Sequence, residues 1–419
     1  MILMNGRRLK KENEIEAIET IKLQILNTLC KPGLSPEVVI HAADWLVKNL
    51  AKGEYDDELA HYVSDFTAFK EEINQICGSF HKAKLKEKYE LELGQWKATL
   101  EQESSGTLRV MPLGVLLHIA AGNMEVLPIF SVLEGLLSGN INLLKLPSID
   151  QGFTMFLLQK LMEYEPSLQE YIYVFDTPST DVVTIQKLMN LANGIVVWGG
   201  DDAVKAVRSY APVNTKIIEW GHKLSFVYLY ELEVPREQLV ALARHLLATK
   251  QLLCSSCQVI YLNTADFEVV KRFGKEFSSI LEQFEQDYEL PKPIQGKITI
   301  ELLARKYEQL LKDGDSEVIY RNQFSSVICK TDSELELSLL YGNVLVKPLP
   351  EDGIISALYK NREHLQTVGL YPKNETTISK FLRLGVTSII GLEQMSSSQL
   401  YKAHDGMFPL QQYCRIVEC

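Results

Sequence analysis

The chain has 419 residues, of which 46% are hydrophobic and 23% charged, and its formal net charge is −11. This length favours about two to three domains, and the composition is typical of a globular protein. The negative charge argues against a nucleic acid or an anionic membrane surface as partner, because both require a basic footprint.

No run approaches the roughly 18 apolar residues of a membrane span, and the N-terminus lacks the apolar core of a signal peptide. We therefore expect no membrane span and a cytoplasmic location. The seven cysteines show no framework pattern, so we expect them to be reduced.

The first hundred residues are predicted to be helical. Apolar residues recur at near-helical spacing from Ile15 to Leu29, and Lys31-Pro-Gly33 ends that run. Ser35 followed by proline begins a second helix. Lys and Glu residues spaced by four predict a long, surface-exposed helix over residues 66–100.

From Leu108 the pattern changes to alternating strands and helices, which indicates a parallel sheet covered on both faces. The predicted strands are Gly114–Ile119, Asn142–Leu146, Tyr171–Phe175, Ile195–Trp198, Lys216–Ile218 and Phe226–Tyr230. The predicted helices between them are Val126–Leu137, Phe153–Tyr164, Asp181–Leu191 and Ala203–Tyr210. Ligands of such sheets bind at the carboxyl ends of the strands.

A second α/β series follows, with a domain boundary predicted near Trp220. Its predicted strands are Gln258–Leu262, Val318–Arg321, Ser326–Lys330, Asn343–Lys347, Leu365–Leu370 and Ser388–Ile390. Its predicted helices are Glu237–Thr249, Phe267–Phe284, Ile298–Lys312, Ile354–Lys360 and Thr377–Leu384, with Pro291-Lys-Pro293 as a linker and a polar end after the last strand.

Cys254 is the strongest candidate for chemistry. The segment Gln251-Leu-Leu-Cys-Ser-Ser-Cys257 lies between a predicted helix and a predicted strand, and small residues flank the first thiol. A thiolate at such a junction can attack a carbonyl, whereas burial in apolar surroundings opposes thiolate formation.

Other candidates follow strand ends. Asn123 lies between a strand and a helix, where its amide can donate to an oxyanion or cap the helix. Lys145 ends a strand and can meet a nucleotide or remain solvated. Gly199 and Gly200 form a strand-to-helix turn that resembles a dinucleotide-binding turn without the full glycine pattern. Glu219 can act as a general base near a thiol, or be an ordinary exposed carboxylate.

Two other patterns are weaker. The Cys254-x-x-Cys257 pair has no second pair of ligands, so we expect no metal site, and a strand follows where a redox pair normally has a helix. His404-Asp405-Gly406 is predicted to be a structural turn rather than a catalytic pair.

Several segments of the chain, taken together in their order along the sequence, resemble the LuxC-like bacterial acyl-CoA reductases. These are the fatty-acid reductases of bioluminescence systems and belong to the aldehyde dehydrogenase superfamily. The resemblance covers roughly residues 107–419. The residues that carry it are HIAAGNMEVLPIFSVLEGLLSGNINLLKLPS (118–148), VVWGGDDAVKAVR (196–208), IIEWGHKLSFVYL (217–229), QLLCSSCQ (251–258), LQTVGL (365–370) and HDGMFPLQQYCRIV (404–417).

The resemblance implies an aldehyde-dehydrogenase-like α/β fold. A helical N-terminal region (1–106) would pack on a Rossmann-type cofactor domain (107–219), followed by an α/β catalytic domain with the thiol (220–390) and a C-terminal tail (391–419). Superfamily members usually associate, so a homo-oligomer is also implied.

The same resemblance assigns roles to individual residues. Cys254 matches the catalytic thiol, and Asn123 matches the asparagine that forms the oxyanion hole with the backbone N–H of the cysteine. Glu219 matches the glutamate of the family's glutamate motif. Lys145 matches the lysine that contacts the adenosine ribose, and Gly199–Gly200 fall in the cofactor-binding turn.

The chain departs from the superfamily pattern at positions that affect hydrolysis and the choice of cofactor. Trp220 and His222 replace a leucine and a glycine beside Glu219, so Glu219 is not expected to serve as a hydrolytic base. Ser148 stands where an acidic residue normally selects NAD, which leaves room for a 2′-phosphate and favours NADPH, although Asp150 keeps NADH open. No role is assigned to Cys257.

The implied reaction is reduction of an acyl-CoA or acyl-protein thioester to the aldehyde through a thioacyl-enzyme on Cys254. With acyl-CoA as the substrate, coenzyme A is released as a product. Acyl-transfer enzymes are implied as partners. The alternatives are an NAD-dependent dehydrogenase that oxidises aldehydes, a non-redox acyl-transfer or carrier protein, and a non-catalytic scaffold subunit.

Overall fold

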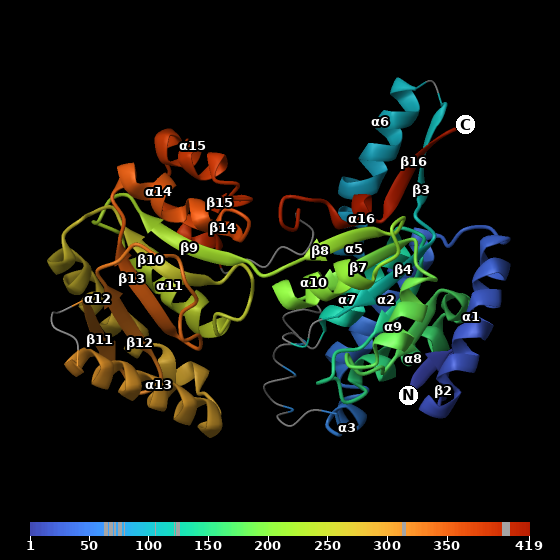
Figure 1. The fold of residues 1–419 in the computed structure, drawn as a ribbon, viewed down its shortest axis with the longest axis horizontal. Coiled ribbons are helices and arrows are strands. Elements are labelled where there is room, and N and C mark those ends of the chain that lie inside the picture. Colours follow the sequence, from blue (N-terminus) through green and yellow to red (C-terminus); the bar gives the residue numbers. More distant parts are fainter. Residues whose placement is uncertain are drawn as a thin grey trace. The chain divides into compact units, whose positions relative to one another are not determined.

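The computed structural model describes residues 1–62, 80–104, 106–120, 126–311, 316–395 and 403–419, together with Phe66, Lys70, Ile73, Gly78 and Gly122. The chain forms two compact units (Figure 1). Unit 1 comprises residues 1–221 and 399–419, and unit 2 comprises residues 222–398. The division lies next to Trp220, and the four predicted domain ranges otherwise stay predictions.

Unit 1 is built on a sheet with strand order β2-β1-β6-β5-β4-β7-β8. Its strands are β1 (Ile2–Met4), β2 (Arg7–Leu9), β4 (Val115–Ile119), β5 (Ile141–Lys145), β6 (Ile172–Phe175), β7 (Gly194–Trp198) and β8 (Lys216–Trp220). Strands β4 to β8 are parallel. The first of these parallel strands, β4, lies in the middle of the sheet. The next two, β5 and β6, are added on one side of it, and β7 and β8 are added on the other side. This strand order is that of a Rossmann fold, so the predicted Rossmann-type sheet is confirmed. Sheets of this topology bind their ligands outside the carboxyl ends of the strands where the order reverses, which here are β4 and β7.

The helices of this sheet are those that the sequence predicts, with ends within two residues. They are α7 (Leu127–Leu137), α8 (Phe153–Tyr164), α9 (Val182–Met189) and α10 (Asp201–Tyr210). Every residue of α7 is buried, because the helix packs on β5 and is covered in turn by α2 (Pro36–Lys52). A helix that is apolar all round is typical of such an enclosed position.

The N-terminal region contains elements that the prediction omitted. Besides α1 (Glu14–Leu29), a hairpin of β1 and β2 extends the sheet, with β1 antiparallel to β6. Asn5 and Gly6 form its turn with φ values of 51° and 70°. An Asn-Gly pair at positive φ is the preferred two-residue hairpin turn.

The predicted surface helix over residues 66–100 is only partly confirmed where the structure describes it. The helix α3 (Asp56–Leu59) precedes this range, and the helical segments described within it are α5 (Lys82–Tyr89), the π-helical η2 (Glu90–Gly94) and the start of α6 (Gln95–Glu103). α6 has no buried residue, but Leu85, Lys88, Glu92 and Leu93 are buried. The alternating Lys and Glu residues therefore include a buried charge cluster that spacing alone did not reveal.

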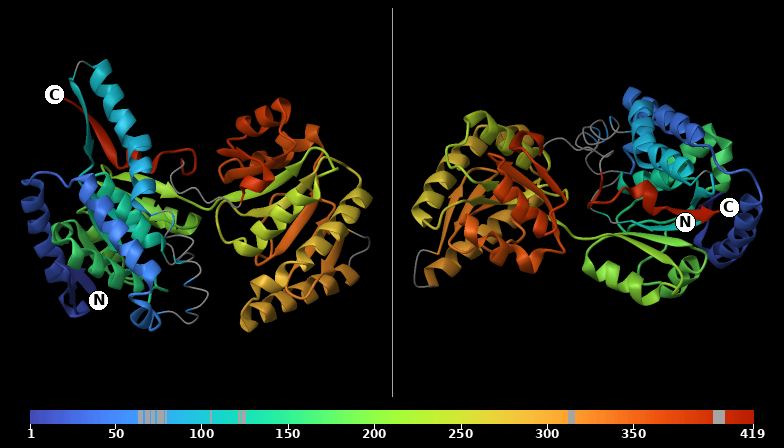
Figure 2. Two further views of the ribbon diagram at one scale, coloured as in Figure 1. Left: turned by 180° about the vertical axis from the view of Figure 1, so that it is seen from behind. Right: turned by 90° about the horizontal axis from the view of Figure 1, so that it is seen from above.

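The C-terminal residues return to unit 1. Strand β16 (Cys414–Glu418) pairs antiparallel with β3 (Leu108–Pro112), and the short helix α16 (Pro409–Gln412) precedes it. The left view of Figure 2 shows β16 beside β3 and α6. The predicted polar end is thus an ordered strand.

Unit 2 is a second sheet, with strand order β11-β12-β13-β10-β9-β14-β15. Its strands are β9 (Leu224–Leu229), β10 (Cys257–Leu262), β11 (Glu317–Arg321), β12 (Ser326–Lys330), β13 (Asn343–Pro348), β14 (Leu365–Tyr371) and β15 (Ser388–Ile390). All pairs are parallel except β11 with β12. Its helices are α11 (Arg236–Ala248), α12 (Phe267–Glu282), α13 (Lys292–Leu311), α14 (Ile354–Leu358) and α15 (Glu375–Arg383).

The predicted linker at Pro291–Pro293 is wrong. α13 begins at Lys292, six residues before the predicted start at Ile298. Proline is tolerated in the first turn of a helix, where its missing N–H has no intrahelical partner. In this part of the chain the prolines therefore mark the start of a helix and not a connection without structure.

In the part of the chain that the structure describes, no helix has both the length and the apolar character needed to cross a membrane.

A buried polar cluster connects α7 to the centre of the sheet of unit 1. The His118 ring contacts the Ser131 hydroxyl oxygen at 2.6 Å and the Asn142 side-chain oxygen at 2.9 Å. Trp198 donates its indole N–H to Ser131 at 2.9 Å. Burial lowers the pKa of His118 to about 4, so the ring is neutral at pH 7.

Gly135 of α7 allows this close approach. A Cβ at position 135 would overlap Asn142 Oδ1 and lie 3.1 Å from His118 Nε2.

We expect Gly135→Ala to lower the free energy of unfolding by about 1–3 kcal/mol, the usual cost of overpacking. Gly296→Ala is the matched control, because a Cβ there meets no atom within 4 Å. Denaturant unfolding should show the Gly296 variant equal to or more stable than the parent. Equal stability losses in both variants would contradict the packing argument.

Candidate active site

Cys254 lies in the turn that joins α11 to β10 in unit 2. The helix ends because Lys250 and Gln251 adopt left-handed conformations, with φ values of 51° and 58°. The Ser256 N–H then donates to the Leu253 carbonyl at 2.9 Å, which closes the turn around Cys254. Cys254 is partly exposed, whereas the next cysteine along the chain is fully buried. The turn therefore leaves Cys254 partly exposed.

The backbone of Cys254 is held from the neighbouring strand. The Ser225 hydroxyl on β9 donates to the Cys254 carbonyl at 2.6 Å and accepts from the Thr367 N–H of β14 at 3.1 Å. Ser225 is itself buried. A single hydroxyl thus connects the cysteine turn to the central strands of the sheet.

Cys257 is the first residue of β10 and has no exposed surface. Its thiol donates to the Val259 carbonyl at 3.3 Å. Burial raises the pKa of the Cys257 thiol far above its ordinary value, despite opposing hydrogen bonds from Val227 and Val259. A buried, protonated thiol is chemically inert, so the structure gives Cys257 the features of a core residue.

Glu219 lies in β8 of unit 1, one residue before the strand ends. Its carboxylate forms a two-point ion pair with Arg208 of α10, with Nε–Oε1 at 2.5 Å and Nη2–Oε2 at 2.8 Å. Hydrogen bonding to Glu219 raises the pKa of Arg208. A carboxylate held in this way has both oxygens engaged by a cation.

The predicted cofactor residues lie at the carboxyl edge of the sheet of unit 1. Lys145 ends β5 and is largely buried, and its ammonium donates to the Ser179 hydroxyl at 2.9 Å. Burial lowers the pKa of Lys145, and the nearby Asp176 opposes that shift. Gly199 and Gly200 follow β7 and lead into α10, while Ser148 is exposed after β5. These residues therefore follow the two strands that flank β4, at the edge of the sheet where a ligand is expected.

Asn123 lies outside the described residues. It lies between β4 and α7, in residues 120–126, of which only Ala120, Gly122 and Val126 are described.

A model of the family described as acyl-CoA reductase (LuxC) matches residues 33–416, which is most of the chain. The chain belongs to the LuxC acyl-CoA reductase family.

Relatives of this LuxC-family chain carry a common name. The long-chain acyl-protein thioester reductase of Aliivibrio fischeri is 24% identical over 331 residues, covering 74% of this chain and 64% of that protein. The protein of the same name from Photobacterium phosphoreum is 25% identical over 369 residues, covering 82% of this chain and 70% of that protein. The matched part therefore spans about two thirds of the length of these relatives.

Solved structures show the fold of the LuxC-family chain. Aldehyde dehydrogenase 21 from Physcomitrella patens, in complex with succinate, superposes with a TM-score of 0.69 at 11% identity, covering 96% of this chain and 90% of that chain. A methylmalonate-semialdehyde dehydrogenase from Sinorhizobium meliloti, assigned as putative and complexed with NAD, gives 0.69 at 13% identity and covers 99% and 96% of the two chains. The predicted aldehyde-dehydrogenase-like fold and family are confirmed.

The predicted turn at His404–Gly406 of the LuxC-family chain is also confirmed. His404 and Met407 exchange backbone hydrogen bonds at 2.7 and 2.9 Å, and Asp405 and Gly406 have φ values of 48° and 78°. The sequence did not show where this turn lies. The His404 ring packs 5.3 Å from Trp198 and 4.9 Å from Trp220, measured between ring centroids. The two tryptophans end β7 and β8, so the turn lies at the carboxyl edge of the sheet of unit 1.

Sequence reasoning missed the polar residues that hold the cysteine turn of the LuxC-family chain. Ser225, Gln251, Gln258 and Ser338 are all buried in unit 2. Polar residues inside apolar strands are a weak signal for such a role, and nothing in the spacing connects them with one another. Their grouping follows only from the folded sheet.

Proposed function

We propose that the chain reduces an acyl thioester to an aldehyde through a thioacyl-enzyme on Cys254. The observation that carries this proposal is the difference between the two neighbouring thiols, since Cys254 is partly exposed and Cys257 is fully buried. The family description and the names of the relatives both specify a thioester or acyl-CoA as the group that is reduced. A thioester carbonyl is a suitable target for an accessible thiolate.

In the proposed mechanism the Cys254 thiolate attacks the thioester carbonyl, and a new C–S bond forms as the original C–S bond breaks. The oxyanion is held by the Cys254 N–H and the Asn123 amide, in the roles that the resemblance implies. The released thiolate is coenzyme A or the thiol of an acyl-protein. A bound reduced nicotinamide cofactor would supply hydride to the acyl carbonyl. The C–S bond to Cys254 then breaks, which releases the aldehyde and restores the Cys254 thiolate.

The carboxyl edge of the sheet in unit 1 fits such a cofactor. Rossmann sheets bind dinucleotides in this crevice. Asp201 and Asp202 begin α10 and disfavour a phosphate at that end of the helix, so the fit depends on Lys145. Lys145 is a cationic group at the same edge, so we propose that it lies near the adenosine ribose and its 2′-phosphate.

The environment of Ser148 supports NADPH rather than NADH. Ser148 is exposed and uncharged. Asp150, which kept NADH open, accepts hydrogen bonds from the N–H groups of Gly152 and Thr154 at 2.7 and 3.3 Å, at the start of α8. Its carboxylate is thus occupied in capping a helix and is less suited to bind ribose hydroxyls.

We expect Ser148→Asp to lower the ratio of kcat/KM for NADPH over NADH by about tenfold or more, corresponding to ~1.4 kcal/mol or more of like-charge repulsion with the 2′-phosphate. Ser148→Ala is the matched control and should keep the ratio of the parent. Steady-state kinetics with both cofactors measure the effect. An unchanged ratio in the aspartate variant would contradict the proposed position of the phosphate.

Glu219 bears on the choice between reduction and hydrolysis. An aldehyde dehydrogenase that forms an acid requires a base to activate water against the acyl-enzyme. We propose that the ion pair with Arg208 keeps the Glu219 carboxylate from this role, so that the acyl-enzyme survives until hydride arrives.

One experiment separates the candidate functions. The purified chain is incubated with acyl-CoA substrates of graded chain length, and NADPH oxidation and aldehyde formation are followed. Reduction of a thioester gives both. A dehydrogenase that forms acids instead reduces NAD with free aldehyde and needs no coenzyme A. An acyl carrier becomes acylated but consumes no NADPH, and a scaffold subunit does neither.

A further inference from the structure

The connection between β12 and β13, residues 331–342, runs beside the cysteine turn in unit 2. We propose that this connection is a strap that positions the Cys254 turn for attack, with Gln251, Gln258 and Ser338 as positioning residues. The proposal rests on the proposed function, because it assigns these residues to the reaction of Cys254.

Gln251 makes the first contact between the turn and the strap. It is 1% exposed, and the three hydrogen bonds of its side chain are all made to buried residues. Its amide donates to the Cys257 carbonyl at 2.8 Å and to the Ser338 hydroxyl at 3.0 Å. Its side-chain oxygen accepts from the Gly342 N–H at 3.0 Å. One side chain thus joins the first residue of β10 to two points of the strap.

Gln258 makes the second contact from a β-bulge. The register of β10 against β9 shifts between Cys257 and Val259, which leaves Gln258 as the extra residue. Its amide donates to the Gln251 carbonyl at 3.0 Å, and its side-chain oxygen accepts from the Ser338 hydroxyl at 2.8 Å. The Ser338 hydroxyl therefore donates to one glutamine and accepts from the other, which uses its full donor capacity.

The backbone on both sides of this contact is strained. Leu340, Tyr341 and Gly342 have φ values of 62°, 53° and 83°, and they face the left-handed residues Lys250 and Gln251. The Tyr341 N–H donates to the Lys250 carbonyl at 2.9 Å. Left-handed conformations of residues other than glycine are unfavourable and persist where the surroundings impose them. The two segments hold one another in these conformations next to the nucleophile.

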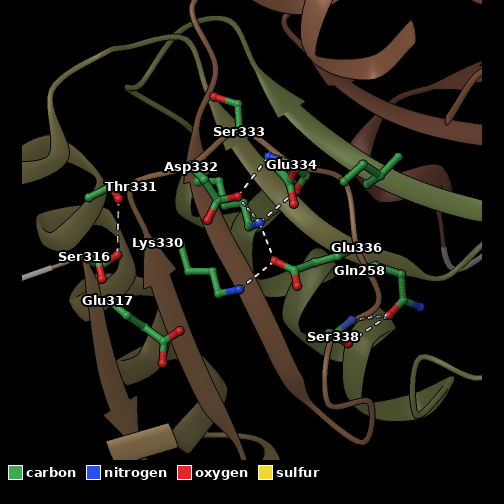
Figure 3. A network of polar contacts seen from close by, with 12 residues as sticks. Gln258, Ser316, Glu317, Lys330, Thr331, Asp332, Ser333, Glu334, Glu336 and Ser338 are labelled. Atoms are coloured by element: carbon green, nitrogen blue, oxygen red, sulfur yellow. Dashed lines mark hydrogen bonds and ion pairs between the residues drawn. The ribbon is translucent and has the colours of Figure 1, made fainter. Parts of the chain in front are cut away.

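The other end of the strap is anchored by charge (Figure 3). Lys347 of β13 has no exposed side-chain surface, and its ammonium contacts Asp332 at 2.6 Å and Glu336 at 2.5 Å. Lys330 of β12 also contacts Glu336, at 2.7 Å. Figure 3 shows these carboxylates on the same connection as Ser338, which reaches Gln258. The strap is therefore fixed to β12 and β13 at one end and to the cysteine turn at the other.

A strap of this kind affects rate more than binding. Misplacing a reacting group by about 1 Å can cost on the order of 10²-fold in rate, even when the change is remote from the reacting atoms. Loss of the Ser338 hydroxyl should thus slow acylation of Cys254 and leave the affinity for substrate almost unchanged.

The test compares Ser338→Ala with two controls. Ser338→Thr keeps the hydroxyl. Ser333→Ala removes another hydroxyl of the same strap, which donates to the Pro348 carbonyl at 2.7 Å and not to the cysteine turn. We expect Ser338→Ala to lower the single-turnover acylation rate by about tenfold or more at unchanged KM for the thioester. Ser338→Thr should restore at least a third of the parent rate, and Ser333→Ala should retain it.

Hydrogen exchange provides a readout that does not depend on the reaction. Backbone amides of residues 249–258 should exchange about tenfold faster in Ser338→Ala than in the parent, and at the parent rate in Ser333→Ala. An unchanged exchange rate in Ser338→Ala, or equal effects of both alanine variants, would overturn the strap. If the parent chain is never acylated, the proposed function fails, while the exchange comparison still decides whether the strap holds the turn.

Discussion

Cys254→Ala is expected to lower the rate of aldehyde formation from an acyl thioester by about 10³-fold or more, the scale seen when a covalent nucleophile is removed. The reason is that no acyl-enzyme can form without the thiol, so hydride has no bound carbonyl to reduce. The rate is measured as NADPH oxidation together with aldehyde release.

Cys257→Ala is the matched control for this variant. Cys257 lies three residues further along the same segment but is fully buried, so its removal changes core packing and not the reacting group. We expect this variant to keep most of the activity and to lose about 1 kcal/mol of stability. Full activity of Cys254→Ala combined with an inactive Cys257→Ala would show that the wrong thiol has been chosen.

Lys88→Met is expected to lower the free energy of unfolding by about 3–5 kcal/mol, the usual effect of removing one partner from a buried charge cluster. Lys88 contacts Glu92 at 2.5 Å and Glu134 at 2.9 Å, and all three side chains are at most 3% exposed. Glu92 also accepts from the Leu410 N–H at 2.8 Å, and Tyr413 donates to Glu134 at 3.3 Å. The cluster thus connects α5 and η2 to α7 and to the C-terminal residues.

The stability loss should depend on pH. Burial raises the pKa of Glu134 to about 7, against the attraction of Lys88. A carboxyl group whose pKa is raised on folding binds its proton more tightly in the folded state, so its contribution to stability falls as pH rises from about 4.5 to 7. Removing Lys88 removes the attraction that lowers this pKa. The variant should therefore be more destabilised at pH 8 than at pH 5.

Lys84→Met on the same helix is the control for Lys88→Met. The Lys84 ammonium lies 2.9 Å from the Glu87 carboxylate, and the Lys84 side chain is 41% exposed. Exposed ion pairs contribute about 0–1 kcal/mol to the free energy of unfolding. Denaturant unfolding at both pH values compares the two variants. A Lys88→Met loss no larger than that of Lys84→Met would contradict the role given to the cluster.

The sequence predicted the parallel sheets well because their signals are local. A buried parallel strand is a short apolar run, and the helices between strands have a different period, so the ends of nearly all these elements agree within two residues. The pairing of strands that are far apart in the sequence leaves no such local pattern. Strand β16 pairs Glu418 with Leu108, and neither segment alone indicates the other.

The candidate site was predictable to the same extent. The position of Cys254 between a helix and a strand is a local property, and the structure agrees with it. Whether Cys257 is buried, whether Glu219 meets Arg208 and whether Ser338 reaches Gln258 depend on how elements pack. The last contact joins residues that are 80 positions apart in the sequence. Such positioning contacts follow from the fold and cannot be obtained from spacing.

In the proposed mechanism, Cys254 carries the acyl group before reduction. The most direct measurement is the intact mass of the chain after incubation with an acyl-CoA and no cofactor, followed by peptide mapping. We predict an increase by one acyl group on the peptide that contains Cys254, absent in Cys254→Ala, and a return to the parent mass with release of aldehyde when NADPH is added. No adduct on the parent chain, an adduct that persists in Cys254→Ala, or release as free acid would contradict an acyl-enzyme on Cys254 that is reduced to the aldehyde.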